Sequence, residues 1–104
     1  MRRIYFEVET PLKRRIRITK EYWELIITFK HPNMRGRENE VIETLKDPDF
    51  IRRSKKDKDV YLYYRKSGNR FVCVVCKHLN GEGFIITTYI TDRVKEGEEI
   101  WRRS

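Results

Sequence analysis

Alanine and glutamine are absent from the 104-residue chain, and no apolar run approaches the roughly 18 residues that a membrane helix needs. The first residues, Met-Arg-Arg-Ile-Tyr-Phe-Glu, also lack the long apolar stretch of a secretory signal. We therefore expect a cytoplasmic protein without a membrane partner. The length suffices for one hydrophobic core and not for two, which predicts a single domain over residues 1–104.

Cysteine and histidine are scarce, with two residues of each. Cys73 and Cys76 fall in a run predicted as a strand, where their odd offset sends the two side chains to opposite faces. Three residues of strand also separate their Cα atoms by ~10 Å, which is too far for a disulfide. The pair is best interpreted as two small buried hydrophobes. Two histidines leave too few soft ligands for zinc, so we expect no metal and no cofactor.

The chain carries a formal charge of +8, and lysine and arginine recur along its whole length. This excess favours a polyanionic partner, and RNA is the partner we expect. The alternative is a solvated, ion-paired surface, because 38% charged residues without alanine or glutamine are typical of hyperthermophile surfaces. Such a surface explains the abundance of charge but leaves the positive excess unexplained.

The first half of the chain predicts two short strands followed by two helices. Residues 3–9 and 14–18 alternate as strands do, around Pro11, and form an N-terminal extension over residues 1–18. Thr19 offers an N-cap to an amphipathic helix that stops before Pro32 and leaves His31 at its C-terminus. A second helix carries Val41 and Leu45 on one stripe and ends before residue 48.

The second half predicts four strands, at residues 50–55, 60–66, 70–78 and 83–92, followed by a basic tail over residues 93–104. The fold class expected is α+β, with two N-terminal helices packed on one face of a four-stranded antiparallel sheet. Two-residue turns at Ser67-Gly68 and Asn80-Gly81 would set which side chains share a face. One face, assigned to the helices, then holds Leu62, Tyr64, Phe71, Cys73, Val75, Phe84, Ile86 and Ile90. The free face holds Tyr61, Tyr63, Arg65, Arg70, Val72, Val74, Cys76, His78, Ile85, Thr87, Tyr89 and Thr91.

The order of several short motifs resembles that of a known family. They are His31-Pro32, Asp47-Pro48, Ile51-x-x-Ser54, Tyr63-Tyr64-Arg65, Val74-Val75-x-Lys77 and Ile86-Thr87-x-Tyr89-x-Thr91, closing at Trp101. Over residues 19–101 the chain is similar to the small phage-type nucleases of the barnase, EndoU, colicin and RelE superfamily. The resemblance implies a metal-independent ribonuclease, often deployed as a toxin, with its site on the sheet face away from the helices.

RNA cleavage without metal needs a base, an acid and fixed cations. His31 is the candidate acid or base, although a histidine that ends a helix can simply bind the last carbonyls. Arg65 is the strongest candidate cation, with strand-end solvation as the alternative. Thr87 and Tyr89 would orient the scissile group. The candidate RNA-binding residues are Arg53, Ser54, Tyr63 and Lys77.

Two other functions fit the same residues. A module that kept the fold and lost catalysis would bind nucleic acid without turnover. A protein-interaction module would use the aromatic face to dock an acidic, antitoxin-like protein, and a toxin would also need such a partner. The hypothesis that best unites the motifs with the basic charge is an RNA endonuclease of toxin type.

Overall fold

The structure is a computed structural model that describes residues 3–104. It opens with strands β1 (Ile4–Glu9) and β2 (Arg15–Thr19), then helix α1 (Lys20–Leu25), a π-helix (Ile26–Lys30) and a 3-10 turn (Pro32–Met34). Helix α2 (Glu38–Lys46) follows. The remaining elements are β3 (Phe50–Ser54), β4 (Val60–Ser67), β5 (Arg70–His78), β6 (Glu82–Thr91) and β7 (Gly97–Arg102).

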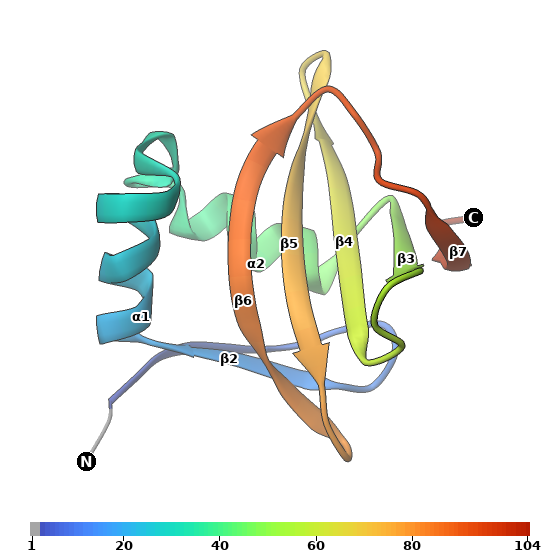
Figure 1. Ribbon diagram of the computed structural model, residues 1–104, viewed down its shortest axis with the longest axis horizontal. Coiled ribbons are helices and arrows are strands. Elements are labelled where there is room, and N and C mark those ends of the chain that lie inside the picture. Colours follow the sequence, from blue (N-terminus) through green and yellow to red (C-terminus); the bar gives the residue numbers. More distant parts are fainter. Residues whose placement is uncertain (1–2) are drawn as a thin grey trace.

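All seven strands join one mixed sheet in the order β1-β2-β6-β5-β4-β3-β7, and β2 runs parallel to β6 (Figure 1). The predicted architecture of two helices on a four-stranded antiparallel sheet is therefore wrong. The N-terminal strands extend the sheet from β6, and the predicted basic tail supplies β7, which pairs with β3. The helical content is also small, because α1 and α2 span only 6 and 9 residues.

The main hydrophobic core lies between the helices and one face of the sheet. Helix α2 passes behind β4, β5 and β6 in Figure 1, while β1 and β2 cross the lower end of these strands. From the helices, Trp23, Ile26, Val41 and Leu45 are fully buried. From the sheet, the same cluster takes Ile51, Tyr63, Val72, Val74, Cys76 and Ile85. The opposite face of β4, β5 and β6, turned toward the viewer in Figure 1, is called the open face below.

The predicted grouping of side chains on the two faces is correct from β4 through the β5–β6 turn. It is wrong for the residues of β6 after Ile85. Lys77 lies opposite Phe84, as a two-residue Asn80-Gly81 turn requires. A β-bulge then inserts Ile86, because Cys76 lies opposite Ile85 while Val75 lies opposite Thr87. The extra residue moves Thr87, Tyr89 and Thr91 to the face of Leu62, and the carbonyl of Ile86 accepts a hydrogen bond from the Tyr22 hydroxyl at 2.6 Å.

The assignment of the helices to a face is also reversed. They cover the face of Tyr63 and Val72, whereas the face of Leu62 and Tyr64 is the open one. Part of the open face carries a second, smaller cluster formed by Phe50, Leu62, Tyr64 and Cys73. The segment between β6 and β7 packs on it through Val94. The open face is therefore partly roofed where β4 meets this segment.

Two local features fix the elements that carry the candidate site. The Thr19 hydroxyl accepts from the backbone N–H of Tyr22 at 3.1 Å and caps α1, as predicted. Gly83 lies so close to β5 that a Cβ there would meet the Lys77 carbonyl oxygen at 2.2 Å. Only glycine allows this approach, which holds the start of β6 against β5. Among residues 3–104, no helix is long and apolar enough to cross a membrane.

Candidate functional site

His31 owes its position to the π-helix that ends α1. The backbone N–H of His31 donates to the carbonyl of Ile26 at 2.7 Å, a bond across five residues rather than four. Pro32 follows and begins a separate 3-10 turn. Because π-helical turns are rare and concentrate at functional sites, this local distortion itself marks His31 as a candidate.

The His31 ring lies beside Tyr89 on the open face. Their ring centroids are 5.4 Å apart at an interplanar angle of 45°, although the residues are far apart in sequence. Thr87 shares the face because it and Tyr89 lie opposite Val75 and Cys73 in the β5–β6 register. The Thr87 hydroxyl oxygen is buried and has no hydrogen-bond partner within residues 3–104. Because this oxygen is covered, like the Tyr89 hydroxyl, it offers no group to a ligand on the surface of the open face.

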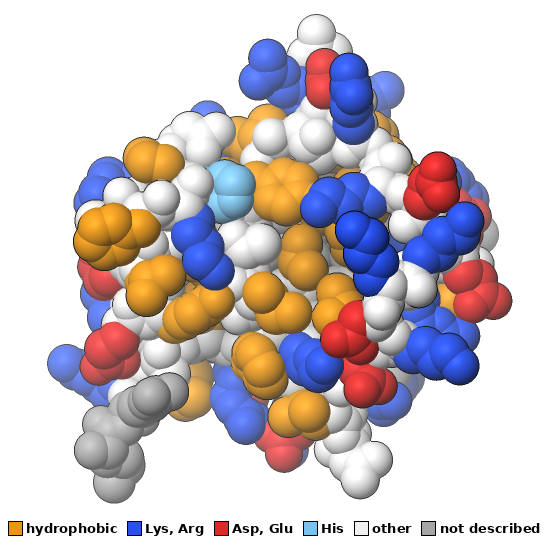
Figure 2. All heavy atoms as spheres, viewed as in Figure 1, with side chains coloured by type: hydrophobic (Ala, Val, Ile, Leu, Met, Phe, Trp, Pro, Cys, Tyr) orange, Lys and Arg blue, Asp and Glu red, His pale blue; other side chains and the backbone are white. Residues whose placement is uncertain are grey.

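Lys95 supplies a cation near the Tyr89 ring. Its Nζ lies 5.9 Å from the centroid of the Tyr89 ring. The backbone of Lys95 is held in place, since its N–H donates to the Tyr64 hydroxyl at 3.1 Å and its carbonyl accepts from Arg52 Nη1 at 3.3 Å. The open face in Figure 2 shows hydrophobic side chains across the strands with lysine and arginine side chains among and around them.

Burial governs the protonation of this group of residues. It lowers the pKa of His31, and the charge of Lys30 lowers it further. A helix C-terminus by itself favours the protonated ring, but burial outweighs that effect on the pKa of His31. Burial raises the pKa of Tyr89 and raises that of the neighbouring Cys73 thiol to about 11. Near neutral pH the site thus presents a neutral imidazole and protonated hydroxyl and thiol groups.

Tyr89 exposes its ring and not its hydroxyl. The residue is half-buried, yet its hydroxyl oxygen has no exposed surface and no hydrogen-bond partner among the described residues. We therefore assign Tyr89 a positioning role, in which the ring packs beside His31 and near the Lys95 ammonium, rather than direct contact with a scissile group.

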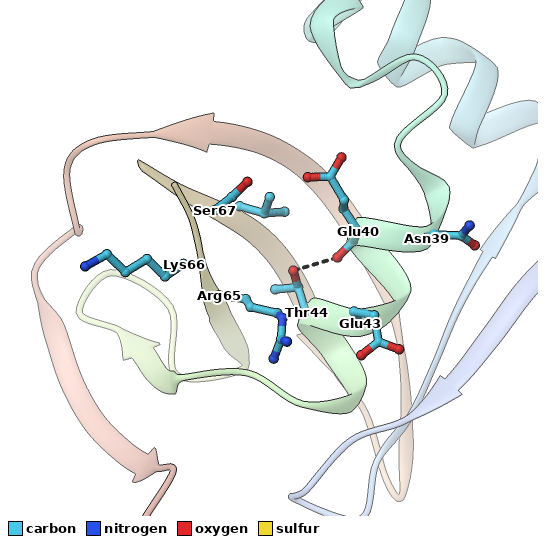
Figure 3. A pocket seen from close by; sticks show the side chains of 8 residues that line it. Asn39, Glu40, Glu43, Thr44, Arg65, Lys66 and Ser67 are labelled. Atoms are coloured by element: carbon cyan, nitrogen blue, oxygen red, sulfur yellow. Dashed lines mark hydrogen bonds between the residues drawn. The ribbon is translucent and has the colours of Figure 1, made fainter. Parts of the chain in front are cut away.

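Arg65 lies on the helix side, away from His31. Its Nη1 donates to the Asp47 carbonyl at 2.5 Å and lies 3.3 Å from Asp47 Oδ2, at the C-terminus of α2. Figure 3 shows Arg65 across a cleft of about 240 Å³ from α2, which contributes Glu40 and Glu43 to the lining. These carboxylates would repel a phosphate in the cleft. The guanidinium of Arg65 instead binds the C-terminal end of α2 through Asp47.

Tyr63 and Arg53 are likewise turned away from the open face. Tyr63 is fully buried, and its hydroxyl donates to Thr10 Oγ1 at 3.0 Å and lies 3.0 Å from His78 Nε2. Arg53 Nη2 is 3.0 Å from Glu98 Oε1 at the β3–β7 pairing. The predicted face shared by Tyr63, Arg65, Thr87 and Tyr89 does not exist. The bulge at Ile86 moves Thr87 and Tyr89 to the open face, while Tyr63 and Arg65 stay on the helix side.

Ser54 and Lys77 do lie on the open face. Ser54 is two residues after Arg52, which pairs with Leu62 of that face, and Lys77 pairs with Val60 and Phe84. Both are engaged. Lys77 Nζ is 3.0 Å from Asp57 Oδ2, and the Ser54 hydroxyl accepts from the N–H of Lys56 at 3.1 Å. They lie toward the β3–β4 turn, where they can border a bound strand.

Sequence reasoning missed Lys95, because it falls in the segment interpreted as a basic tail. No local pattern distinguishes Lys95 from the other lysines; only the path of the chain from β6 to β7 brings it to Tyr89. Within residues 3–104, no three histidine, cysteine, aspartate or glutamate side chains come together as metal ligands would. Comparisons of the chain with protein-family models, curated proteins and solved structures give no match.

Proposed function

We propose that this protein is a metal-independent endoribonuclease that receives RNA on the open face of its sheet. The observation that carries the proposal is the placement of His31 and Lys95 beside the same Tyr89 ring, 5.4 and 5.9 Å from its centroid. A neutral imidazole and a nearby ammonium are the base and the cation that RNA cleavage needs. The resemblance to small phage-type nucleases and the charge of +8 support the same function.

The proposed reaction uses the RNA itself as the nucleophile. His31 removes the proton of the 2′-hydroxyl, the 2′-oxygen forms a bond to phosphorus, and the bond from phosphorus to the 5′-oxygen breaks. The products are a 2′,3′-cyclic phosphate and a 5′-hydroxyl. The proton that His31 takes up equals the one that the departing 5′-oxygen needs, so one imidazole can serve both steps. The lowered pKa of His31 keeps it in the basic form at neutral pH.

The other residues stabilise or position the reacting groups. The ammonium of Lys95 faces the charge that develops on the phosphorane oxygens. Thr87 has a buried hydroxyl and positions the strand that carries Tyr89 rather than contacting a phosphate oxygen. Tyr89 keeps the imidazole and the ammonium near a single ring.

The test is cleavage of total RNA by the purified protein in EDTA. We expect fragments with 2′,3′-cyclic phosphate ends, a loss of about 10²–10⁴-fold in rate for His31→Ala, and no cleavage of an oligonucleotide that carries 2′-deoxyribose throughout. Tyr89→Phe should cleave like the parent, because its hydroxyl is buried, whereas Tyr89→Ala should not. Equal cleavage by the parent and His31→Ala would refute the proposal.

A second candidate is an RNA-binding module without catalysis. It is favoured by the engagement of Arg65 and Arg53 with carboxylates on the helix side and at the β3–β7 edge, which leaves fewer guanidinium groups for a phosphorane. Intact RNA that is retarded on a gel, with an affinity that falls steeply with salt, would select this alternative. Under either candidate we propose a cytoplasmic location and, for a toxin, an acidic antitoxin-like protein that covers the open face.

A further inference from the structure

We infer that a cleft lined by Lys95 holds one unpaired nucleobase and so restricts the enzyme to single-stranded RNA. The inference rests on the proposed function in one respect, namely that RNA lies on the open face. The cleft measures about 440 Å³ and lies between the β3–β4 turn, β4, β5 and the segment that leads to β7. Its volume falls within the range of sites that enclose small ligands, about 300–1,000 Å³.

The floor of the cleft is aliphatic. Leu62 and Val75 lie opposite each other in the β4–β5 register, and Val60 lies two residues before Leu62 on the same face. Val60 and Val75 are only half-buried, so part of their surface is available to a ligand. A flat, weakly polar nucleobase covers such a floor well, whereas a phosphate has no partner there.

The rim of the cleft is cationic. Lys55, Lys56 and Lys95 line it, and Lys56 and Lys95 form no ion pair within residues 3–104. Lys55 is 3.2 Å from Glu96, but both side chains are largely exposed, so this pair exchanges readily with a phosphate. A base on the floor with its backbone phosphates at the rim satisfies both parts of the cleft.

The cleft is continuous with the site of the proposed reaction. Lys95 lines the cleft and also lies over the Tyr89 ring, and Val75 of the floor lies opposite Thr87. A nucleotide in the cleft therefore places its neighbouring phosphate toward Thr87 and His31. In an A-form duplex the bases are stacked and paired, and only an unpaired base can be splayed out into such a cleft.

The experiment measures affinity in the His31→Ala background, which prevents cleavage. Its probes are a fluorescein-labelled 12-nucleotide uridine RNA and the duplex of this RNA with a 12-nucleotide adenosine RNA, both followed by fluorescence anisotropy. We expect the single strand to bind at least about tenfold more tightly than the duplex. Val60→Glu, which adds a carboxylate to the floor, should raise the Kd for the single strand about tenfold. Lys56→Gln should raise it about threefold and lower the salt slope by about one.

Lys46→Gln is the matched control, because Lys46 is an exposed lysine at the end of α2, on the other side of the sheet. Its affinity should equal that of the parent. Should Val60→Glu fail to fold, Lys56→Gln keeps the test decisive, since an exposed turn lysine can be replaced without loss of structure. Equal affinities for single strand and duplex, or a Lys56→Gln protein that binds like Lys46→Gln, would overturn the inference.

Failure of the inference can be distinguished from failure of the proposed function. Cleavage by the parent protein together with unaltered binding by the cleft variants overturns the cleft and leaves the nuclease. Absence of cleavage together with weakened single-strand binding by the cleft variants supports the cleft and refutes the nuclease.

Discussion

Acid should destabilise this protein through His78, which is buried on the helix side of the sheet. The His78 ring stacks on Tyr61 with centroids 3.8 Å apart, and its Nε2 lies 3.0 Å from the Tyr63 hydroxyl. Burial, followed by the charge of Arg14, lowers the pKa of His78 to about 4. The imidazole is therefore neutral in the folded protein at pH values where the unfolded chain, with a pKa near 6.5, already binds a proton.

The sign and the size of the effect follow from these two pKa values. Below pH 6.5 the unfolded state binds more protons, so the free energy of unfolding falls as the pH is lowered toward the folded pKa. Between pH 7 and pH 5 the loss is about 2 kcal/mol, and the full shift corresponds to about 3 kcal/mol. His78→Gln removes this linkage, while its amide can still contact the Tyr63 hydroxyl.

The assay is urea unfolding followed by far-UV circular dichroism at pH 7, 6 and 5. The free energy of unfolding of the parent minus that of His78→Gln should decrease by about 2 kcal/mol over this range, and the subtraction removes the contribution of carboxylates common to both proteins. His31→Gln is the comparison variant: burial also lowers the pKa of His31, but the residue is only half-buried, so the decrease should have the same sign and be smaller. A difference that stays constant with pH would refute the buried network and would return Tyr63 to the set of residues accessible to RNA.

Three further predictions concern the site and the sheet. Lys30→Gln removes a charge that lowers the pKa of His31, so the acid limb of the cleavage rate should move to higher pH; an unmoved limb would show that His31 is not the titrating base. Gly83→Ala should cost about 2 kcal/mol or more in urea unfolding, because its Cβ would meet the Lys77 carbonyl oxygen at 2.2 Å, and stability equal to the parent's would show that β6 can retreat. Arg65→Gln should lower stability by about 1 kcal/mol by uncapping α2, yet leave RNA affinity close to that of the parent. If Arg65→Gln weakened binding as much as Lys95→Gln, the RNA would lie on the helix side instead.

The local elements could be predicted from the sequence because their signals are local. The four central strands begin and end within one or two residues of their predicted bounds, since glycine turns and alternation mark them. The hydroxyl of Thr19 and the ring of Pro32 mark the two ends of the first helical segment in the same way. The β5–β6 register between the turn and the bulge followed from the length of the Asn80-Gly81 turn.

The sheet as a whole could not be predicted, because its causes lie far apart in the chain. The parallel pairing of β2 with β6 joins residues more than 60 positions apart, and nothing in either strand specifies the other. The bulge at Ile86 is associated with a hydrogen bond from Tyr22, 64 positions away. Both faces of β4 and β5 are hydrophobic, so amphipathicity could not decide which face the helices cover.

Two of these errors offset each other at the candidate site. The helices were assigned to the wrong face, and the bulge moved Thr87 and Tyr89 to the other face, so both residues still lie on the free side with His31. Tyr63 and Arg65 lie in β4, before the bulge, so only the wrong assignment of the helices affects them. In the structure they lie on the side that the helices cover. The structure thus places Thr87 and Tyr89 on one face, with the His31 ring beside Tyr89, for a reason that the sequence does not contain.

The division of labour between arginine and lysine supports recognition of a flexible strand. Within residues 3–104, six arginines form ion pairs with carboxylates, including Arg65 with Asp47 and Arg53 with Glu98. The cations that surround the proposed cleft are lysines, which hold phosphate as mobile point charges rather than in a planar, bidentate grip. Such a rim attracts any RNA backbone and imposes little sequence preference. Selectivity must then come from the aliphatic floor of the cleft. This floor accepts a nucleobase only after the base has left its stack. The open face therefore distinguishes single-stranded from double-stranded RNA rather than one sequence from another.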